Sequence, residues 1–481
     1  MLTRIKLVGL PCLLLLCCTL PHLDQGDFNR DSGRYAAVGL YMWTDGQLGV
    51  PYLNPDTPYF NKPPLAMAIH GLFLKLFHVH VAVAKFPSIL AALGVLILSV
   101  LTLERIASRV EALVSGLILA TTYEFFRRTH EISLDFWQLL FVMLAVYLVV
   151  RSLQQSNPVG LLLAGVPIGL ALLCKPLMAL GVLPILAGWA LLQRQRRAAI
   201  WLLVGTPVVA LMVAGPWHWY MWHRFGPAFI KQYFGHEVLE RAEGKMATNP
   251  LGHHFQILAQ TYWPWMLAVA WAAWHRWSRA PSPQRRPARD AVWLGGSWVA
   301  YVLLLLSLFP DKKVNYALPV YPMLSWVAAA GLCRLGWPWL RAWRERAFAG
   351  LAPAAAGLLV LLSVLPIQFQ PPPNKDWQAL LRWLHEQHIP PATLYYRDLI
   401  PNLVCYYYLK TGVFPKPAPT GTNEPANGRF LILTQENPQA LTNAPESVVF
   451  NSGGLTIISL AGTNRAPVEP SQGIPPFQSN R

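Results

Sequence analysis

Repeated apolar runs constrain this chain more than any other feature of its sequence. They occupy residues 5–23, 81–103, 110–123, 134–151, 158–174, 176–193, 199–217, 255–274, 291–309, 315–333 and 347–366. A helix needs about 20 apolar residues to cross a bilayer. Only 13% of the residues are charged and 54% are hydrophobic, whereas soluble domains carry about 25% charged residues. The sequence therefore predicts a mostly α-helical polytopic membrane protein with about eleven transmembrane helices, and it excludes a soluble fold.

Basic residues set the expected orientation. With the amino terminus in the cytoplasm, every strongly basic connector falls on the cytoplasmic side, as the positive-inside rule requires. These connectors hold Arg4, Lys6, Arg105, Arg109, Arg151 and the segments 194–197, 276–289 and 334–346. The opposite side then receives 24–80, 124–133, 218–254, 310–314 and everything after 367. The net charge of +16 thus reports topology, and we expect no nucleic-acid partner.

The two ends of the chain differ in character. We expect 1–23 to be an uncleaved anchor, because no small-residue cleavage site follows its apolar core. Residues 1–366 are expected to form the transmembrane domain, with a first outer loop at 24–80 and a second at 218–254. Short strand patterns and an amphipathic helix then predict a small α/β domain at 367–461 on the outer face. The Pro- and Ser-rich segment 462–481 is expected to be a disordered tail.

The six cysteines show no paired spacing, and they indicate neither a zinc site nor a disulfide framework. The outer side carries single cations among aromatic residues, which suits an anionic headgroup site. The alternative is ordinary snorkelling of long side chains at the interface. These cations are Arg34, Lys62, Arg127, Arg128, Lys175, Arg241, Lys312 and Lys313.

Two outer stretches hold the first candidate site residues. In RDSGRYAAVGLYMW (30–43), Asp31 or Ser32 is placed to cap an amphipathic surface helix, and Asp31 and Arg34 share one turn. A local ion pair on a capped helix explains this pattern without any function. In NKPPL (61–65), Lys62 precedes a helix start, where both its charge and the helix dipole favour a phosphate.

Three further outer elements add acids, a histidine and cations. Asp135 lies at the mouth of the fourth apolar run, and Tyr316 follows two lysines just before the tenth. His236 and Glu237 are adjacent in the second outer loop, an arrangement that suits a divalent metal only weakly. Acids, a histidine and cations on one side of a membrane are the ingredients for handling a phosphate leaving group.

These outer segments together resemble a known family. DSGRYAAVGLYMWTDGQLGVPYL (31–53) and YFNKPPLAMAIHGLF (59–73) resemble the first outer loop of the GT-C integral membrane glycosyltransferases. The most similar branch contains the lipid A aminoarabinose transferases and the protein O-mannosyltransferases. Further resemblance lies, in order, at SLD (133–135), LCKP (173–176), PAFIKQYFGHEVLER (227–241), YWPW (262–265) and KKVNYALPVYP (312–322).

The resemblance implies a GT-C fold in the bacterial cytoplasmic membrane and an inverting transfer from a polyprenyl-phosphate-linked sugar, without a nucleotide cofactor. It implies Asp31 as the catalytic carboxylate, with Arg34 orienting it or meeting the phosphate. It also implies Asp135 as the second acid. Lys62, Arg241 and Tyr316 would hold the donor phosphate, and His236 would meet a metal.

One departure from the family concerns the metal. Asn61 stands before Lys-Pro-Pro where the family often has a glutamate, and an amide oxygen is the weaker ligand for a divalent ion. Metal dependence is therefore left open, with Glu237 as a possible replacement. Besides a transferase, the sequence leaves a transporter or flippase of lipid-linked sugars, a non-catalytic homologue and an O-antigen ligase or polymerase. We expect a monomer that meets membrane lipids and a lipid or protein acceptor, with the sugar undetermined.

Overall fold

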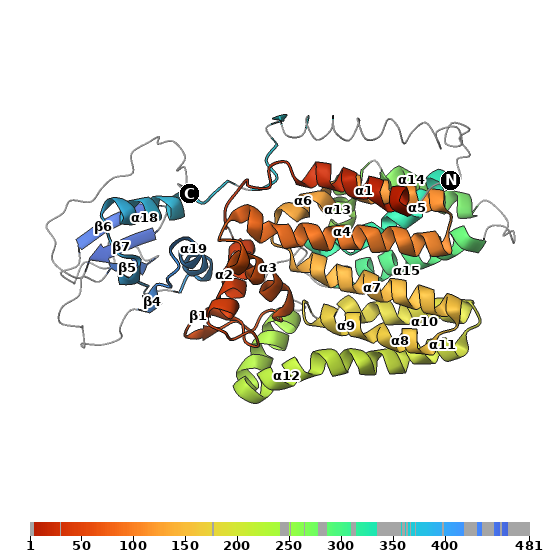
Figure 1. The fold of residues 1–481 in the computed structure, drawn as a ribbon, viewed down its shortest axis with the longest axis horizontal. Coiled ribbons are helices and arrows are strands. Elements are labelled where there is room, and N and C mark those ends of the chain that lie inside the picture. The colour runs from red at the N-terminus through yellow and green to blue at the C-terminus, as the bar shows by residue number, and fades with distance from the viewer. Residues whose placement is uncertain are drawn as a thin grey trace.

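The computed structural model describes residues 4–28, 30–175, 178–240, 250, 252–263, 265–277, 286–308, 314–333, 357, 361, 364–365, 367–370, 372–396, 399–417, 431–434, 447–452 and 455–459. Most of these residues are helical, and the helices form one elongated bundle. A small sheet-containing unit lies beyond one end of the bundle, and the amino terminus lies at the other end (Figure 1).

Four helical stretches in the described part of the chain are long and apolar enough to cross a membrane. They are α4 (Val81–Ile106), α7 (Leu134–Gln155), the stretch Arg196–Gly235 that includes α12 (Thr206–Ile230), and Asp290–Ser307 within α15 (Arg286–Leu308). The shorter bundle helices are α1 (Arg4–Thr19), α5 (Arg109–Thr121), α8 (Pro158–Leu163), α9 (Gly165–Leu172), α10 (Val182–Leu192), α11 (Arg196–Ile200), α13 (His253–Thr261), α14 (Trp265–Trp277) and α16 (Val320–Leu332). The predicted number of eleven spans stays a prediction, since most of 347–366 lies outside the described residues.

Two apolar runs fold differently from a simple span. The run 158–174 is divided between α8 and α9 at Ala164. The run 199–217 does not end at 217, because α12 continues to Ile230 and a π-helical segment follows over Lys231–Glu240. The second outer segment, expected from 218, therefore begins as helix. Its direction changes at Gly226, whose positive φ of 54° suits a residue without a Cβ.

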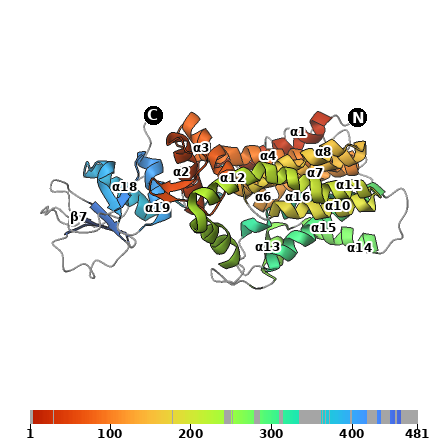
Figure 2. The same cartoon turned by 90° about the horizontal axis from the view of Figure 1, so that it is seen from below.

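Ion pairs gather several helix termini at the end of the bundle that holds the amino terminus. Glu104 near the end of α4 binds Arg4 at the start of α1 at 3.3 Å and Arg109 at the start of α5 at 2.9 Å. Arg105 also donates to Gln154 at the end of α7. Arg4, Arg105 and Arg109, which we expected on the cytoplasmic side, thus lie together at one end of the bundle, opposite the sheet (Figure 2).

The other end of the bundle carries the first outer segment. It contains α2 (Arg30–Thr44), α3 (Leu65–Leu76) and a two-stranded sheet of β1 (Tyr52–Asn54) and β2 (Thr57–Pro58). Helices α2 and α3 cross where Gly39 meets Gly71, and a Cβ on either glycine would collide with the backbone of the opposite helix. Because α2 begins at Arg30, Asp31 lies in its first turn. The prediction that Asp31 or Ser32 caps this helix is therefore wrong.

The sheet-containing unit follows the bundle in sequence. Helices α18 (Lys375–Glu386) and α19 (Pro401–Thr411) pack with a five-stranded mixed sheet of order β4-β3-β5-β7-β6. The strands are β3 (Leu394–Tyr396), β4 (Lys416–Pro417), β5 (Leu431–Thr434), β6 (Ser447–Ser452) and β7 (Leu455–Ser459). One face of α19 joins the core of this unit through Leu403 and Tyr407, and another packs on α2 through Val404 and Tyr408. Helix α19 therefore fixes the unit against the first outer segment.

Candidate active site

Asp31 stands in the first turn of α2 with its side chain 54% exposed. The Arg34 guanidinium lies one turn later, 3.6 Å from the Asp31 carboxylate. Both Nε and Nη2 of Arg34 donate to Oδ1 of Asn402 in α19, at 3.1 and 2.7 Å. Arg34 is thereby held from one side by α19, while the Asp31 carboxylate stays accessible. A carboxylate at the amino end of a helix is also stabilised as an anion by the helix dipole.

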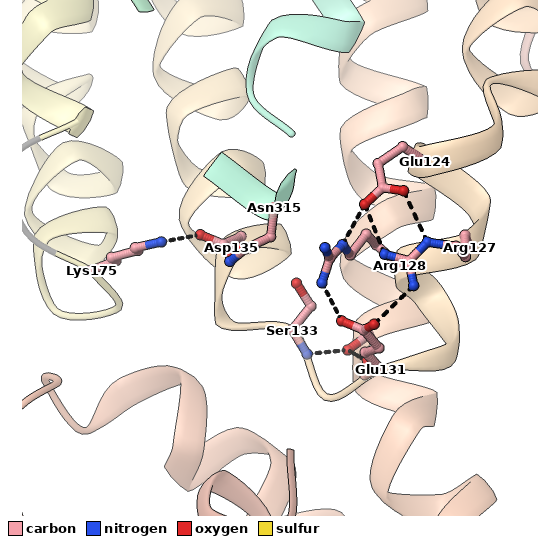
Figure 3. Close-up of polar contacts among 9 residues, drawn as sticks. Glu124, Arg127, Arg128, Glu131, Ser133, Asp135, Lys175 and Asn315 are labelled. Carbon is pink, nitrogen blue, oxygen red and sulfur yellow. Dashed lines mark hydrogen bonds and ion pairs between the residues drawn. The ribbon is translucent and has the colours of Figure 1, made fainter. Parts of the chain in front are cut away.

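Asp135 stands in the first turn of α7 and has both carboxylate oxygens engaged (Figure 3). The Lys175 ammonium donates to Oδ1 at 2.5 Å, and the Asn315 amide donates to Oδ2 at 3.1 Å. The Asp135 side chain is 13% exposed and that of Lys175 is 22% exposed. Lys175 Nζ also lies 4.7 Å from the centre of the Tyr316 ring. Asp135 therefore holds Lys175 and Asn315 together from two separate parts of the chain, and Lys175 in turn lies over the ring of Tyr316.

Tyr35 connects the Asp31 and Asp135 groups electrostatically. Burial holds the pKa of the Tyr35 hydroxyl well above its ordinary value, and the negative charges of Asp31 and Asp135 raise it further. Tyr35 also packs on the hydrophobic cluster that contains Leu134, the neighbour of Asp135, so the amino-terminal part of α2 and the start of α7 face one region of the molecule.

A backbone hydrogen bond at the start of α3 places Lys62 near the same region. The Leu65 amide donates to the carbonyl of Leu173 at 3.1 Å, so the Lys-Pro-Pro turn lies against the segment that carries Lys175. Lys62 Nζ itself donates to the Asn61 carbonyl at 3.1 Å. The structure thus brings the predicted residues Asp31, Arg34, Lys62, Asp135 and Tyr316 to one end of the bundle.

The second outer segment packs on the first beside Asn61. The Phe60 ring contacts Phe225 and Phe229 at centroid distances of 4.9 and 5.8 Å. The Gln232 amide donates to Oδ1 of Asn61 at 3.0 Å. This bond uses one of the two acceptor lone pairs of the Asn61 oxygen.

The remaining predicted residues follow Gln232 in sequence. The backbone of His236 and Glu237 belongs to the segment Lys231–Glu240, and Arg241 lies outside the described residues. Within the described part of the chain, no group of three or more His, Cys, Asp or Glu side chains is arranged to hold a metal ion. The side chains of His236 and Glu237 lie outside the described ones, so the metal site stays a prediction.

A closed ion-pair network lies beside Asp135 (Figure 3). Glu124 accepts from Arg127 at 2.8 Å and from Arg128 at 2.7 Å. Glu131 accepts from the same two arginines at 3.1 and 2.5 Å. The two positive charges are therefore matched by two carboxylates. From the sequence, these arginines were candidate cations for an anionic headgroup. In the structure they form ion pairs with Glu124 and Glu131.

This network predicts a pH-dependent stability. Burial tends to raise the pKa of Glu124, but hydrogen bonds and charges from Arg127 and Arg128 outweigh burial and leave the pKa below its ordinary value. A lowered folded-state pKa adds stability above the unfolded pKa of about 4.3, and this stability is lost as the pH falls through the folded pKa. We therefore expect the thermal midpoint in detergent to fall at acid pH. Glu124→Gln should lower that midpoint at pH 7 by the equivalent of about 3–5 kcal/mol and flatten its acid dependence. An unchanged pH profile in the variant would show that Glu124 does not cause it.

Comparison with known proteins identifies the fold. The sequence model of a family described as dolichyl-phosphate-mannose-protein mannosyltransferase matches residues 61–220. The crystal structure of ArnT from Cupriavidus metallidurans bound to undecaprenyl phosphate superposes with a TM-score of 0.68 at 19% identity, covering 96% of this chain and 99% of that one. The chain has the GT-C fold. The resemblance inferred from the sequence is thereby confirmed.

Two further comparisons extend the fold relationship. ArnT from the same organism in the apo state gives a TM-score of 0.64 at 17% identity, covering 94% of this chain and 97% of that one. The archaeal oligosaccharyltransferase AglB from Archaeoglobus fulgidus, in complex with an inhibitory peptide and a dolichol-phosphate, gives 0.52 at 14% identity. That match covers 88% of this chain and 61% of AglB. No curated protein sequence gives a significant match.

Three contributors to this candidate site were given no individual role from the sequence. Lys175 was noted only as an outer cation within LCKP, and its pairing with Asp135 was not foreseen. Asn315 directly precedes the predicted Tyr316 in KKVNYALPVYP (312–322), so its position in the sequence could have indicated it as a site residue. Asn402 lies 368 residues after Arg34 and gave no signal in the sequence.

Proposed function

We propose that this chain is an inverting glycosyltransferase that moves a sugar from a polyprenyl-phosphate carrier to an acceptor of the cell envelope. The observation that carries the proposal is the accessible Asp31 carboxylate at the same end of the bundle as Lys62, Lys175 and Tyr316. A half-exposed carboxylate suits proton removal from an acceptor. Lysines and a tyrosine suit stabilisation of a phosphate that gains negative charge.

The proposed reaction has one displacement step. An acceptor oxygen attacks the anomeric carbon, and its proton passes to Asp31. The bond between that carbon and the phosphate oxygen breaks, and its electron pair stays on the phosphate. The products are the glycosylated acceptor and the free polyprenyl phosphate, which carries one more negative charge before Asp31 returns its proton to solvent. Lys62, Tyr316 and Arg241 are proposed to bind this phosphate.

The geometry favours different roles for the remaining residues. Arg34 is already held by Asn402 and faces Asp31, which supports a role in orienting Asp31. Asp135 has both oxygens engaged, which supports positioning of Lys175 and not proton transfer. We propose Lys175 as an additional cation near the donor phosphate, with its charge partly offset by Asp135.

The proposed setting is a bacterial cytoplasmic membrane. The basic connectors at one end of the bundle would face the cytoplasm, and the end with α2, α3 and the sheet would face the periplasm. A lipid-linked donor would then meet Asp31 at the outer surface. Membranes from an expressing strain, supplied with polyprenyl-phosphate-linked sugars, should form a glycosylated product, and mass spectrometry of envelope lipids and glycoproteins from a deletion strain should show which acceptor loses its sugar. A deletion strain with an unaltered envelope would contradict the proposal.

We also propose that transfer does not require a divalent metal. Asn61 replaces the expected carboxylate, and its oxygen accepts from Gln232. Treatment with EDTA is therefore expected to leave the initial transfer rate unchanged, and elemental analysis should find no stoichiometric metal in the purified chain. Loss of activity that Mn²⁺ or Mg²⁺ restores would contradict this prediction and assign a ligand role to His236 or Glu237.

A further inference from the structure

A groove with a volume of about 730 Å³ lies between the first outer segment and the sheet-containing unit. Its walls come from the last turn of α2, the turn between β1 and β2, the end of α3, and the segment from α19 to β4. Asp31 stands at the opposite end of α2. Since α2 has 15 residues, the two places are about 20 Å apart at a rise of 1.5 Å per residue. The groove is therefore separate from the candidate active site.

Polar groups converge in this groove. Asp45 and Asp56 are exposed acids of the lining, which also includes Tyr41 of α2. Burial raises the pKa of Tyr41 to about 12, and the nearby carboxylates of Asp45 and Asp56 in the same lining add to the effect. The Thr44 and Tyr408 hydroxyls are hydrogen-bonded at 3.0 Å. The groove thus offers several acceptors and hydroxyls within a small space.

Aromatic rings make one wall of the groove rigid. The Tyr408 ring stacks on Phe414 with centroids 4.0 Å apart, and the Tyr41 ring meets Phe414 edge-on at 5.0 Å. Carboxylates accept hydrogen bonds from hydroxyl groups, and aromatic rings pack against the apolar C–H faces of a sugar ring. The lining also contains Lys75 and Lys416, so two ammonium groups balance the two carboxylates. A polyhydroxylated, largely uncharged ligand suits this wall better than a strongly charged one.

One edge of the groove is apolar and borders a predicted membrane span. Val79 belongs to the lining, and the membrane-spanning helix α4 begins at Val81. Just before Val79, Leu76 and Phe77 are 65% and 62% exposed. Exposed apolar side chains next to a span suit contact with lipid. A ligand in the groove is therefore able to keep its polar part among Asp45 and Asp56 and its apolar part in the membrane.

We propose that this groove binds the saccharide headgroup of a glycolipid. The inference rests on the proposed function, because it identifies the acceptor as a membrane glycolipid whose sugars extend from the reacting group toward the groove. A headgroup of several sugars has the length to connect two places separated by one helix. Binding at the groove would fix the acceptor relative to Asp31 without taking part in the chemistry.

Binding of a water-soluble oligosaccharide tests the proposal. The probe is the oligosaccharide released from lipopolysaccharide by mild acid, titrated by calorimetry into the full chain in nanodiscs. The wild type should bind it, and Asp45→Asn combined with Asp56→Asn should weaken binding by about tenfold or more, because hydrogen bonds to charged acceptors are lost. Glu386→Gln, an exposed acid of α18 outside the groove, should bind as the wild type does. All three substitutions keep the side-chain shape, and equal thermal midpoints would verify folding.

The outcomes separate this inference from the proposed function. Asp31→Asn should bind the oligosaccharide normally, since Asp31 lies outside the groove. Absence of binding to the wild type, or undiminished binding to the Asp45→Asn/Asp56→Asn variant, would overturn the glycolipid groove and leave sugar transfer intact. Normal binding by a wild type that transfers no sugar would overturn the transferase and leave the groove as a glycan site.

Discussion

Asp31→Asn is expected to lower the rate of sugar transfer by about 10²–10⁴-fold, the range that a general base contributes. Asparagine keeps the size of the side chain and its place in the first turn of α2, but it has no carboxylate to take the acceptor proton. The Arg34–Asn402 contact does not depend on Asp31, so the fold should be retained. The measurement is the initial rate of transfer from a radiolabelled polyprenyl-phosphate sugar in proteoliposomes.

A matched control separates the catalytic effect from a general loss of acidic charge. Asp376 stands in the first turn of α18, as Asp31 does in α2, but it accepts from Ser452 within the sheet-containing unit. Asp376→Asn should keep most of the transfer activity. Full activity of Asp31→Asn in the same assay would remove Asp31 from the chemistry and point to another carboxylate.

Lys175→Met is expected to lower both stability and activity. It leaves Asp135, whose side chain is 13% exposed, with the Asn315 amide as the remaining described donor to its carboxylate. Breaking a buried ion pair from one side costs about 3–5 kcal/mol, because the other charge stays buried. The loss should appear as a lower thermal midpoint and as a higher KM for the lipid donor, since Tyr316 loses the contact with the Lys175 ammonium.

Two companion variants test the cause of this loss. Lys175→Met with Asp135→Leu removes both charges, and it should recover part of the stability but none of the donor affinity. Lys375→Met removes an exposed lysine of α18 and should change neither quantity. If Lys175→Met keeps the wild-type midpoint, the contact between Lys175 and Asp135 contributes nothing to folding.

The sequence predicted helices well where the apolar runs were long and poorly where packing sets their limits. Runs at 81–103 and 134–151 coincide with α4 and α7, because bilayer thickness and apolar length agree there. The continuation of α12 to Ile230 was not predictable from hydropathy, because its aromatic residues pack on the first outer segment. Phe225 and Phe229 contact Phe60, which is far away in sequence.

The candidate site was predictable in its residue types and not in its contacts. The spacing of Glu124, Arg127, Arg128 and Glu131 already contained the i,i+3 and i,i+4 pairs of a helix, yet the arginines were interpreted singly. The Lys175–Asp135 and Arg34–Asn402 contacts join distant segments, and no local pattern encodes such pairs. The start of α2 was also mispredicted from local pattern. The helix begins at Arg30, so Asp31 lies inside the helix and not at its cap.

The most direct test of the account measures both products of one reaction. The purified chain in proteoliposomes receives a polyprenyl-phosphate-linked sugar and a glycolipid acceptor, and mass spectrometry follows free polyprenyl phosphate and glycosylated acceptor over time. The account predicts that the two appear in equal amounts with inverted configuration at the anomeric carbon, and that a nucleotide sugar does not replace the lipid donor. Movement of intact lipid-linked sugar across the bilayer without either product would contradict it and identify a transporter.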